Sequence, residues 1–261
     1  SLANTLYSLP SGRVRGRGLL LLLLLLSACG RHQTQSEAPQ GDTIPLRYAR
    51  NLTIVRYDGY TKVSLADPWN NGKTLHTYAL VPKTSGVPGD VKNSGMTLVN
   101  VPVERAVVGT SVLCGLLDGL GCRDAISGVC DVQYVNIPFV QEGCRSGRIA
   151  DCGSGLSPTL EKIIDIQPEA IFLSPFQNSG GYGRVEEIGV PIVEMADYME
   201  TSALGRAEWV RFYGMLLGAE QQADDHKHRM HINALRQQTG VDDIAIYRLQ
   251  DQNQNHSNDQ C

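Results

Sequence analysis

The chain has 261 residues, of which 42% are hydrophobic and 19% are charged, and its formal net charge is −4. These proportions are ordinary for a globular protein with a core. The negative balance excludes a typical nucleic-acid-binding surface, because the densest basic residues are confined to Arg13, Arg15 and Arg17.

Residues 1–28 have the organisation of an export signal. The three arginines precede eight leucines, Leu19–Leu26, which as a helix would span only about 12 Å and cannot cross a bilayer. A positive segment, a short apolar run and small residues are typical of a secretory signal peptide. Leu26-Ser27-Ala28-Cys29 resembles the bacterial lipobox, which implies that the leader is removed and that Cys29 carries a lipid. An ordinary secretory peptide with an incidental cysteine is the alternative.

A β-rich region is predicted after the leader. Residues 29–46 are polar and rich in turn formers, which predicts a flexible tether. Three β-like runs follow, separated by turn signals: Leu52–Asp58, Lys62–Asp67 and His76–Pro82. They predict an antiparallel meander that caps one edge of a main sheet.

From Thr97 onward, short strands alternate with helices. The predicted strands are Thr97–Val103, Arg105–Val108, Ala125–Cys130, Ala170–Leu173 and Pro191–Met195. The predicted helices are Thr110–Leu120, Ser157–Gln167 and Val185–Ile188. In the clearest helix, Ser157 is expected to be the N-cap and Leu160, Ile163 and Ile164 to form one apolar face. This alternation predicts an α/β fold, a single Rossmann-like lobe whose parallel sheet is flanked by helices.

The C-terminal part is predicted to be helical. Leu204–Leu217 is an apolar helix that ends at Gly218, and Ala219–Thr239 is a long polar helix. Residues 240–261 contain too few apolar side chains for a core and are predicted to be disordered. Asp224, His226, His228 and His231 could suggest a metal site on the polar helix, but a solvated polar face is the favoured interpretation, and no metal site is predicted.

The six cysteines after Cys29 are Cys114, Cys122, Cys130, Cys144, Cys152 and Cys261. They contain no CxxC pair, which argues against a structural zinc site. The favoured interpretation is small buried hydrophobic residues at the ends of elements. One disulfide, Cys144–Cys152 or Cys130–Cys152, is an alternative that the spacing leaves open.

Three stretches together resemble a known family. They are VPVERAVVGTSVLCGLLDGLG (Val101–Gly121), GSGLSPTLEKIIDIQPEAIFLSP (Gly153–Pro175) and GVPIVEMADYMETSALGRAEWVRFYGMLLG (Gly189–Gly218). Their order and spacing, together with the lipobox, resemble the class III substrate-binding proteins of ABC importers, in the version found in Bacteroidetes-type bacteria.

The resemblance implies two α/β lobes joined by a rigid helix, with an iron–siderophore, haem or cobalamin ligand held between them. Residues 47–218 then correspond to the first lobe and 219–239 to the inter-lobe helix, and the second lobe is missing, so the chain is expected to be truncated. It also implies an exported, lipid-anchored protein on the periplasmic side of the inner membrane. Its partners would be the ABC permease and ATPase subunits, and it would be neither an enzyme nor a protein with a resident cofactor.

The ligand is expected at the carboxyl ends of the parallel strands. The predicted ligand-binding residues lie in the loops there: Thr110, Ser111, Ser154, Leu156, Phe176, Gln177, Asn178, Tyr182, Tyr198 and Glu200, with Asp197 beside them. Each polar member has a turn or capping role as its alternative. By resemblance, Glu161 is the glutamate that docks onto arginines of the permease, while a first-turn acid favoured by the helix dipole is the ordinary interpretation.

Other functions are less well supported by the sequence. Gly153-Ser154-Gly155 lacks the GxSxG spacing of a nucleophile elbow, and GGYG lacks both GxGxxG and a P-loop lysine–serine pair. Two alternatives remain: a truncated lipoprotein remnant that binds nothing, and a surface lipoprotein that binds protein partners.

Overall fold

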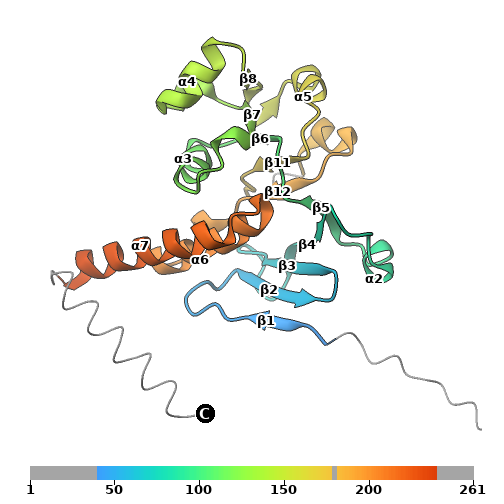
Figure 1. Cartoon of the computed structure of the whole chain (residues 1–261), viewed down its shortest axis with the longest axis vertical. Coiled ribbons are helices and arrows are strands. Elements are labelled where there is room, and N and C mark those ends of the chain that lie inside the picture. The colour runs from blue at the N-terminus through green and yellow to red at the C-terminus, as the bar shows by residue number, and fades with distance from the viewer. Residues whose placement is uncertain (1–39, 178–180, 240–261) are drawn as a thin grey trace, which may run out of the picture. The chain divides into compact units, whose positions relative to one another are not determined.

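The computed structural model describes residues 40–177 and 181–239. The predicted leader, Cys29, most of the tether, Asn178 and the predicted disordered tail lie outside the described residues. The described part contains two five-stranded sheets and one short hairpin, with helices packed around them (Figure 1).

The first sheet has the order β1-β2-β3-β4-β5. Its strands are β1 (Asp42–Ile44), β2 (Leu52–Tyr57), β3 (Tyr60–Ala66), β4 (Thr74–Pro82) and β5 (Thr97–Val101). Strands β1 to β4 pair antiparallel, which confirms the predicted meander, and β5 joins parallel to β4 after the short helix α2 (Gly89–Lys92).

Two strands of this sheet correct the sequence prediction. β1 lies within the predicted tether, where Ile44 packs against the core and Thr43 pairs with Val55 of β2. β5 was predicted to belong with the parallel lobe, but it extends the first sheet beside β4, with Val99 fully buried. A strand pattern reports which side chains are buried, and it does not report which sheet the strand joins.

The second sheet is parallel throughout and has the order β12-β11-β6-β7-β8, as predicted for an α/β lobe. Its strands are β6 (Ala106–Val108), β7 (Ile126–Val129), β8 (Ala150–Asp151), β11 (Ala170–Leu173) and β12 (Ile192–Glu194). Both faces are buried: Ala106 and Val108 enter one hydrophobic cluster and Val107 enters the other. This explains the continuous apolar runs in the sequence.

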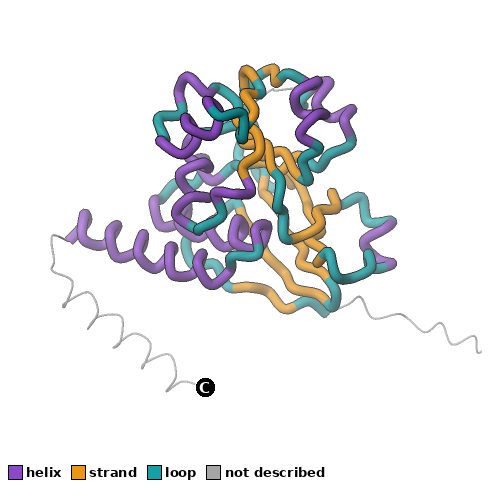
Figure 2. The backbone as a smooth tube through the Cα atoms, turned by 45° about the horizontal axis from the view of Figure 1, so that its top comes forward, coloured by secondary structure: helices purple, strands orange, loops and turns teal. Residues whose placement is uncertain are grey.

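Helices cover both faces of the parallel sheet (Figure 2). Helices α3 (Ser111–Gly119), α4 (Pro138–Arg145) and α6 (Ala203–Leu217) pack on the face of Val108, whereas α5 (Leu160–Ile166) and the 3-10 helix η3 (Gly183–Ile188) pack on the face of Val107. The short 3-10 helices η1 (Arg123–Ala125), η2 (Val132–Tyr134) and η4 (Asp197–Met199) lie in the connections, and α7 (Glu220–Thr239) follows α6.

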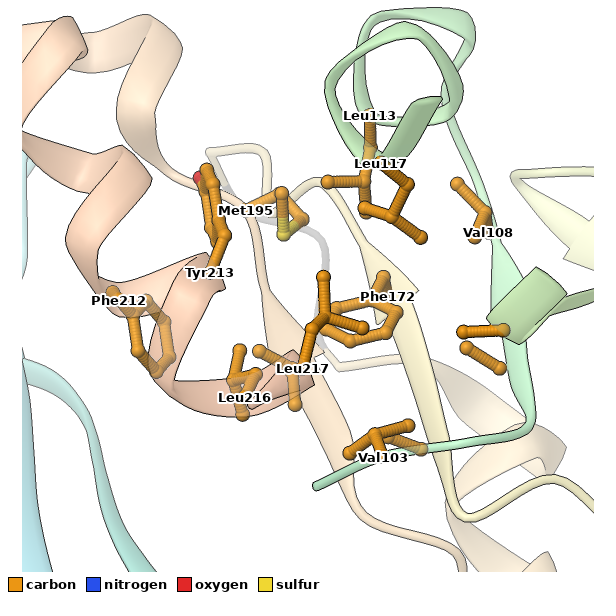
Figure 3. Close-up of a cluster of buried hydrophobic side chains, with 14 of the residues drawn as sticks. Val103, Val108, Leu113, Leu117, Phe172, Met195, Phe212, Tyr213, Leu216 and Leu217 are labelled. Carbon is orange, nitrogen blue, oxygen red and sulfur yellow. The ribbon is translucent and has the colours of Figure 1, made fainter. Parts of the chain in front are cut away.

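Helix α6 joins the two sheets into one core. The ring centroid of Phe212 lies 5.9 Å from that of Tyr78 on β4, while Leu217 lies beside Phe172 of β11 (Figure 3). Trp209 is fully buried within the same cluster. The apolar helix predicted over Leu204–Leu217 is therefore confirmed, and it ends at Gly218, whose φ of +64° suits glycine.

The helix predicted over Ser157–Gln167 is shorter than expected. Residues Gly153–Ser154 (β9) and Ser157–Pro158 (β10) form a two-stranded hairpin, so α5 begins only at Leu160, and Thr159 precedes it in place of the predicted cap Ser157. Ile163 is buried, but Ile164 is 55% exposed and does not share its apolar face. Backbone pairing within the hairpin thus outweighed the capping signal of Ser157 and Pro158.

The remaining elements were predicted in part. Helix α4 and strand β8 left no clear signal in the sequence, because both are short and polar. Val140 is the fully buried side chain by which α4 packs on the sheet. Helix α7 matches the predicted polar helix, and its role between two lobes stays a prediction. Within the described ranges, no helix combines the length and the apolar character needed to cross a membrane.

Candidate functional site

The carboxyl ends of the parallel strands form one edge of the second sheet, which we call the carboxyl edge. The chain runs outward from β6 to β7 and β8, and then on the other side to β11 and β12. The connections therefore diverge between β6 and β11. In open α/β sheets, ligands bind in the crevice at such a point.

Each of the five connections that leave the carboxyl edge exposes one large apolar side chain near its start, in a loop, a short 3-10 helix or the first turn of α3. The exposed fractions are 74% for Val112 after β6, 75% for Tyr134 after β7, 81% for Leu156 after β8, 46% for Phe176 after β11 and 40% for Tyr198 after β12. Among the described residues, Ile164 on α5 is the one other exposed large hydrophobic side chain. We call these five residues the apolar rim.

A cavity of about 150 Å³ opens at the divergence point. Its lining combines apolar and polar side chains: Thr110, Val112, Leu113, Leu116, Ser174, Met195, Asp197, Tyr198 and Tyr213. Tyr213 donates a hydrogen bond to Asp197 Oδ1 at 2.7 Å, and the hydroxyl of Tyr198 donates to the carbonyl oxygen of Pro175. Burial, and then the charge of Asp197, raises the pKa of both tyrosines. Both hydroxyls therefore stay protonated at neutral pH and act as donors.

The hairpin β9–β10 forms the wall of a second cavity of about 390 Å³, which also lies at the carboxyl edge. Its lining includes Leu156, Ser157, Phe176, Tyr182 and Arg184. The turn of the hairpin is fixed from two sides: Asp131 Oδ2 accepts a hydrogen bond from the backbone N–H of Gly155 at 2.9 Å, and Ser154 Oγ accepts from that of Leu156 at 3.3 Å. Leu156 is thus held at the exposed tip.

Several predicted site residues come together, while others support the backbone. Leu156, Phe176 and Tyr182 line the larger cavity, and Thr110, Asp197 and Tyr198 line the smaller one. Thr110 is also the N-cap of α3, because its Oγ1 accepts a hydrogen bond from the N–H of Leu113 at 3.3 Å.

The other polar predictions lie at the edge without lining a cavity. Ser111 is half-buried in the first turn of α3, whereas Ser154 and Gln177 are exposed. Their ligand contact stays a prediction.

Glu200 has a structural role that the sequence did not indicate. Its side chain is buried, and its carboxylate accepts hydrogen bonds from the backbone N–H groups of Arg50 and Asn51 and from Trp209 Nε1, at 2.9–3.0 Å. These donors come from the fold itself. We therefore leave Glu200 out of the proposed ligand site.

Glu161 lies in the first turn of α5, as expected for a first-turn acid, and it is exposed to solvent. The helix follows the hairpin β9–β10 directly, so Glu161 lies close in sequence to the carboxyl edge. Its accessible carboxylate is compatible both with a helix-dipole contact and with docking to a partner.

Val112 and Tyr134 were missed in the sequence, although they complete the apolar rim. Each lies within the first five residues after a predicted strand, which is the signal that could have found them. After the first of these strands, the polar residues Thr110 and Ser111 were predicted from the sequence as site residues, and after the second no site residue was predicted. An apolar residue beside a strand or in a helix is usually assigned to the core.

The cysteines in the described ranges are all free thiols. This overturns the two disulfides left open above and favours the interpretation as small buried residues. Cys144 packs with the cluster on the α4 face, whereas Cys130 and Cys152 lie in the cluster on the opposite face of the sheet. Burial raises the pKa of Cys130 to about 12 and that of Cys152 to about 11, so neither thiol is reactive near neutral pH.

The polar residues of α7 form contacts typical of a solvated helix. Asp224 Oδ1 accepts hydrogen bonds from Arg211 Nε at 2.9 Å and from Lys227 Nζ at 3.2 Å. Within residues 40–177 and 181–239, no group of three or more His, Cys, Asp or Glu side chains is arranged to hold a metal ion.

Comparison with known proteins finds lipoproteins. No family model matches the chain. Two uncharacterized lipoproteins of Methanocaldococcus jannaschii are similar: one is 26% identical over 210 residues, covering 73% of this chain and 50% of the relative, and the other is 25% identical over 195 residues, covering 71% and 48%. The chain thus spans about half the length of the curated relatives it matches.

Solved structures with partial similarity are periplasmic and siderophore-related binding proteins. The petrobactin-binding protein YclQ from Bacillus subtilis is 22% identical with a TM-score of 0.39, covering 49% of this chain and 43% of that one. Staphylococcus aureus SirA complexed with staphyloferrin B is 20% identical (TM-score 0.37, 49% and 41%). The vitamin B12 binding protein BtuF of Vibrio cholerae is 17% identical (TM-score 0.41, 52% and 51%).

Proposed function

We propose that this chain is the ligand-capturing lipoprotein of an ABC importer and that it holds a metal chelate at the carboxyl edge. The observation that carries the proposal is the apolar rim, in which every parallel strand is followed by an exposed apolar side chain. Single exposed hydrophobic residues are normal, but their concentration at one edge indicates a surface that is covered when a ligand binds.

The chemistry of the edge suits a broad, partly apolar ligand. Tyr134, Phe176 and Tyr198 offer aromatic faces, and the two cavities at the edge are lined by few charged side chains, Asp197 in one and Arg184 in the other. Haem and cobalamin are broad macrocycles that combine apolar surface with polar groups at their margins, and metal–siderophore complexes are of comparable breadth; small-molecule sites are likewise mostly apolar with a few placed polar groups. The names of the solved structures, which include siderophore-, haem- and vitamin B12-binding proteins, support this class of ligand.

Membrane attachment and delivery belong to the same proposal. The similarity to lipoproteins supports lipidation of Cys29 after export. Placement of the folded part on the periplasmic side of the inner membrane is part of the proposal. Exposed Glu161 is proposed as the contact to arginines of the permease, which works with the ATPase subunits. The protein would bind and release its ligand without performing chemistry on it.

The proposal predicts that Leu156 contributes to ligand affinity. Leu156→Asn should weaken binding about tenfold or more, because covering a leucine side chain contributes about 1.5–3 kcal/mol. Haem, ferric siderophores and cobalamin would be titrated separately, with quenching of protein fluorescence as the measurement.

Ile164→Asn is the matched control, since Ile164 is also exposed but lies on α5 outside the rim. It should bind like the unmodified chain, and both variants should keep the unmodified melting temperature. Equal weakening by both substitutions, or no saturable binding of any of the three chelates, would contradict the proposal.

A further inference from the structure

A cavity that none of the five rim residues lines lies between the two sheets. Its volume is about 670 Å³, and it is lined by Leu75, His76, Thr97 and Leu98 of the first sheet and by residues of η3 and β12. It shares only Gly181 and Tyr182 with the cavity beside the hairpin. A volume of this size is within the range of small-molecule sites.

Glu194, the last residue of β12, carries a buried carboxylate at the wall of this cavity. Its Oε1 accepts a hydrogen bond from the hydroxyl of Tyr182 at 3.1 Å, and its backbone N–H donates to the hydroxyl of Tyr78 at 2.9 Å. Its Oε2 is buried and accepts no hydrogen bond from any described residue. An ionised oxygen in this condition is costly, because it has lost water without gaining a donor.

His76 is the nearest basic group, but its position is determined by other contacts. Its Nδ1 lies 3.4 Å from Glu194 Oε2 without forming a hydrogen bond. Its Nε2 lies 2.7 Å from Thr97 Oγ1, and its ring stacks on Tyr78 with centroids 4.4 Å apart. The imidazole therefore forms one side of the cavity and is within ion-pairing distance of Oε2 when it is protonated, but it donates no hydrogen bond to this oxygen.

The other lining side chains define the chemistry of an occupant. Glu186 adds a second carboxylate, and the lining contains no lysine or arginine, so an anion is disfavoured. Leu75, Leu98 and Ile192 provide an apolar surface. The described residues do not group three metal-ligating side chains here, which disfavours a metal ion.

We propose that this cavity is a binding site for a small organic ammonium ion with an apolar body. The ammonium group donates to Glu194 Oε2, and the apolar body lies against Leu75, Leu98 and Ile192. The hydroxyl of Tyr182 supports the arrangement, since burial, and then the charge of Glu194, raises its pKa and keeps it a donor to Oε1. The site shares Gly181 and Tyr182 with the cavity beside the hairpin, but its carboxylate and its apolar surface are separate from the apolar rim.

The test compares benzylammonium with benzyl alcohol, which has a similar shape and no charge. The unmodified chain should bind benzylammonium about tenfold tighter or more in calorimetric titration, since a charge-assisted hydrogen bond contributes about 1.5–3 kcal/mol. The imidazole signals of His76 should shift in NMR spectra during the same titration. Equal affinities for the two compounds, or the absence of saturable binding, would overturn the proposal.

Glu194→Gln should abolish the preference for the ammonium ion, while Glu187→Gln, which changes an exposed carboxylate outside the lining, should preserve it. Val190→Trp fills the cavity without altering Glu194, and it should weaken benzylammonium binding about fivefold or more. If Glu194→Gln does not fold, the Val190 variant decides, and unchanged affinity there overturns the proposal. Leu156→Asn should leave this binding unchanged, which separates the site from the carboxyl edge.

Discussion

Two buried glutamates connect the N-terminal segment to helix α6. Glu208 accepts hydrogen bonds from the backbone N–H groups of Arg47, Tyr48 and Ala49 at 2.7–2.9 Å. Glu200 accepts from the next two N–H groups of the same segment. Five consecutive backbone N–H groups thus donate hydrogen bonds to two carboxylates that lie about 150 residues later in the chain. Partly buried N–H groups in a non-regular segment need such partners, because no neighbouring strand supplies them.

Glu208→Gln should therefore lower the free energy of unfolding by about 2–3 kcal/mol, because a carboxamide has one acceptor oxygen and turns an NH₂ group toward the donors. The measurement is urea unfolding followed by circular dichroism. Glu161→Gln is the control, since this exposed carboxylate should contribute within about 0.5 kcal/mol. Equal stability of the two variants would contradict the role given to Glu208.

At the scale of elements, an ion-pair group links the two sheets at the end opposite the carboxyl edge. Glu169, just before β11, accepts a hydrogen bond from the N–H of Glu104 at 2.7 Å and one from Lys83 Nζ at 2.9 Å. Lys83 directly follows β4 of the first sheet. Burial opposes ionisation of Glu169, but the N–H of Glu104 and the Lys83 ammonium outweigh it and lower the pKa of this carboxyl.

Glu169→Gln should cost about 1 kcal/mol of stability at pH 7, a value reduced from that of a buried pair because the site is partly solvated. A lowered pKa in the folded state means that the contribution is present above the ordinary carboxyl value of 4.5 and is lost as the pH falls through the folded value. Urea unfolding at pH 7, 5 and 3 should show the difference from the unmodified chain shrinking toward pH 3. A difference that is constant over this range would argue against the ion-pair explanation.

At the scale of the whole described fold, the two hydrophobic clusters on either side of the parallel sheet share its strands. Val107 and Val108 are adjacent in β6, yet they belong to different clusters, and α6 extends the cluster of Val108 to the first sheet. Because successive side chains of a strand point to opposite faces of the sheet, each buried strand contributes to both hydrophobic clusters and links their stability. We expect the two faces to lose their structure together on unfolding.

The free thiols test this expectation, because they sample both clusters. Cys114 lies in one and Cys130 and Cys152 in the other, all fully buried, and burial raises the pKa of each thiol to about 11 or 12. With iodoacetamide at pH 8, Cys122 and Cys144 should react about 100-fold faster than the three fully buried thiols, since both are only half-buried. Peptide mapping by mass spectrometry gives the rates. Rapid labelling of Cys130 and Cys152 with Cys114 still protected would contradict joint unfolding.

The sequence predicted most elements that depend on local pattern. The apolar runs of β6, β11 and β12, the helix over Leu204–Leu217 and its end at Gly218 were all confirmed, because burial on both faces of a sheet and helix capping leave signals within a few neighbouring residues. Three members of the apolar rim were proposed as ligand contacts from the sequence: Phe176 and Tyr198 follow predicted strands, and Leu156 precedes the helix predicted over Ser157–Gln167.

Only the tertiary structure decided the partners of those elements. β5 pairs with the first sheet, and the hairpin β9–β10 moves the start of α5 to Leu160. The carboxylate of Glu200 accepts hydrogen bonds from the backbone N–H groups of Arg50 and Asn51. The cavity at Glu194 likewise combines side chains from β4 and β12, more than 100 residues apart. The periodicity of a segment indicates which of its side chains are buried. Pairing between distant segments depends instead on which surfaces meet when the chain folds, and this pairing leaves no local pattern in a single sequence.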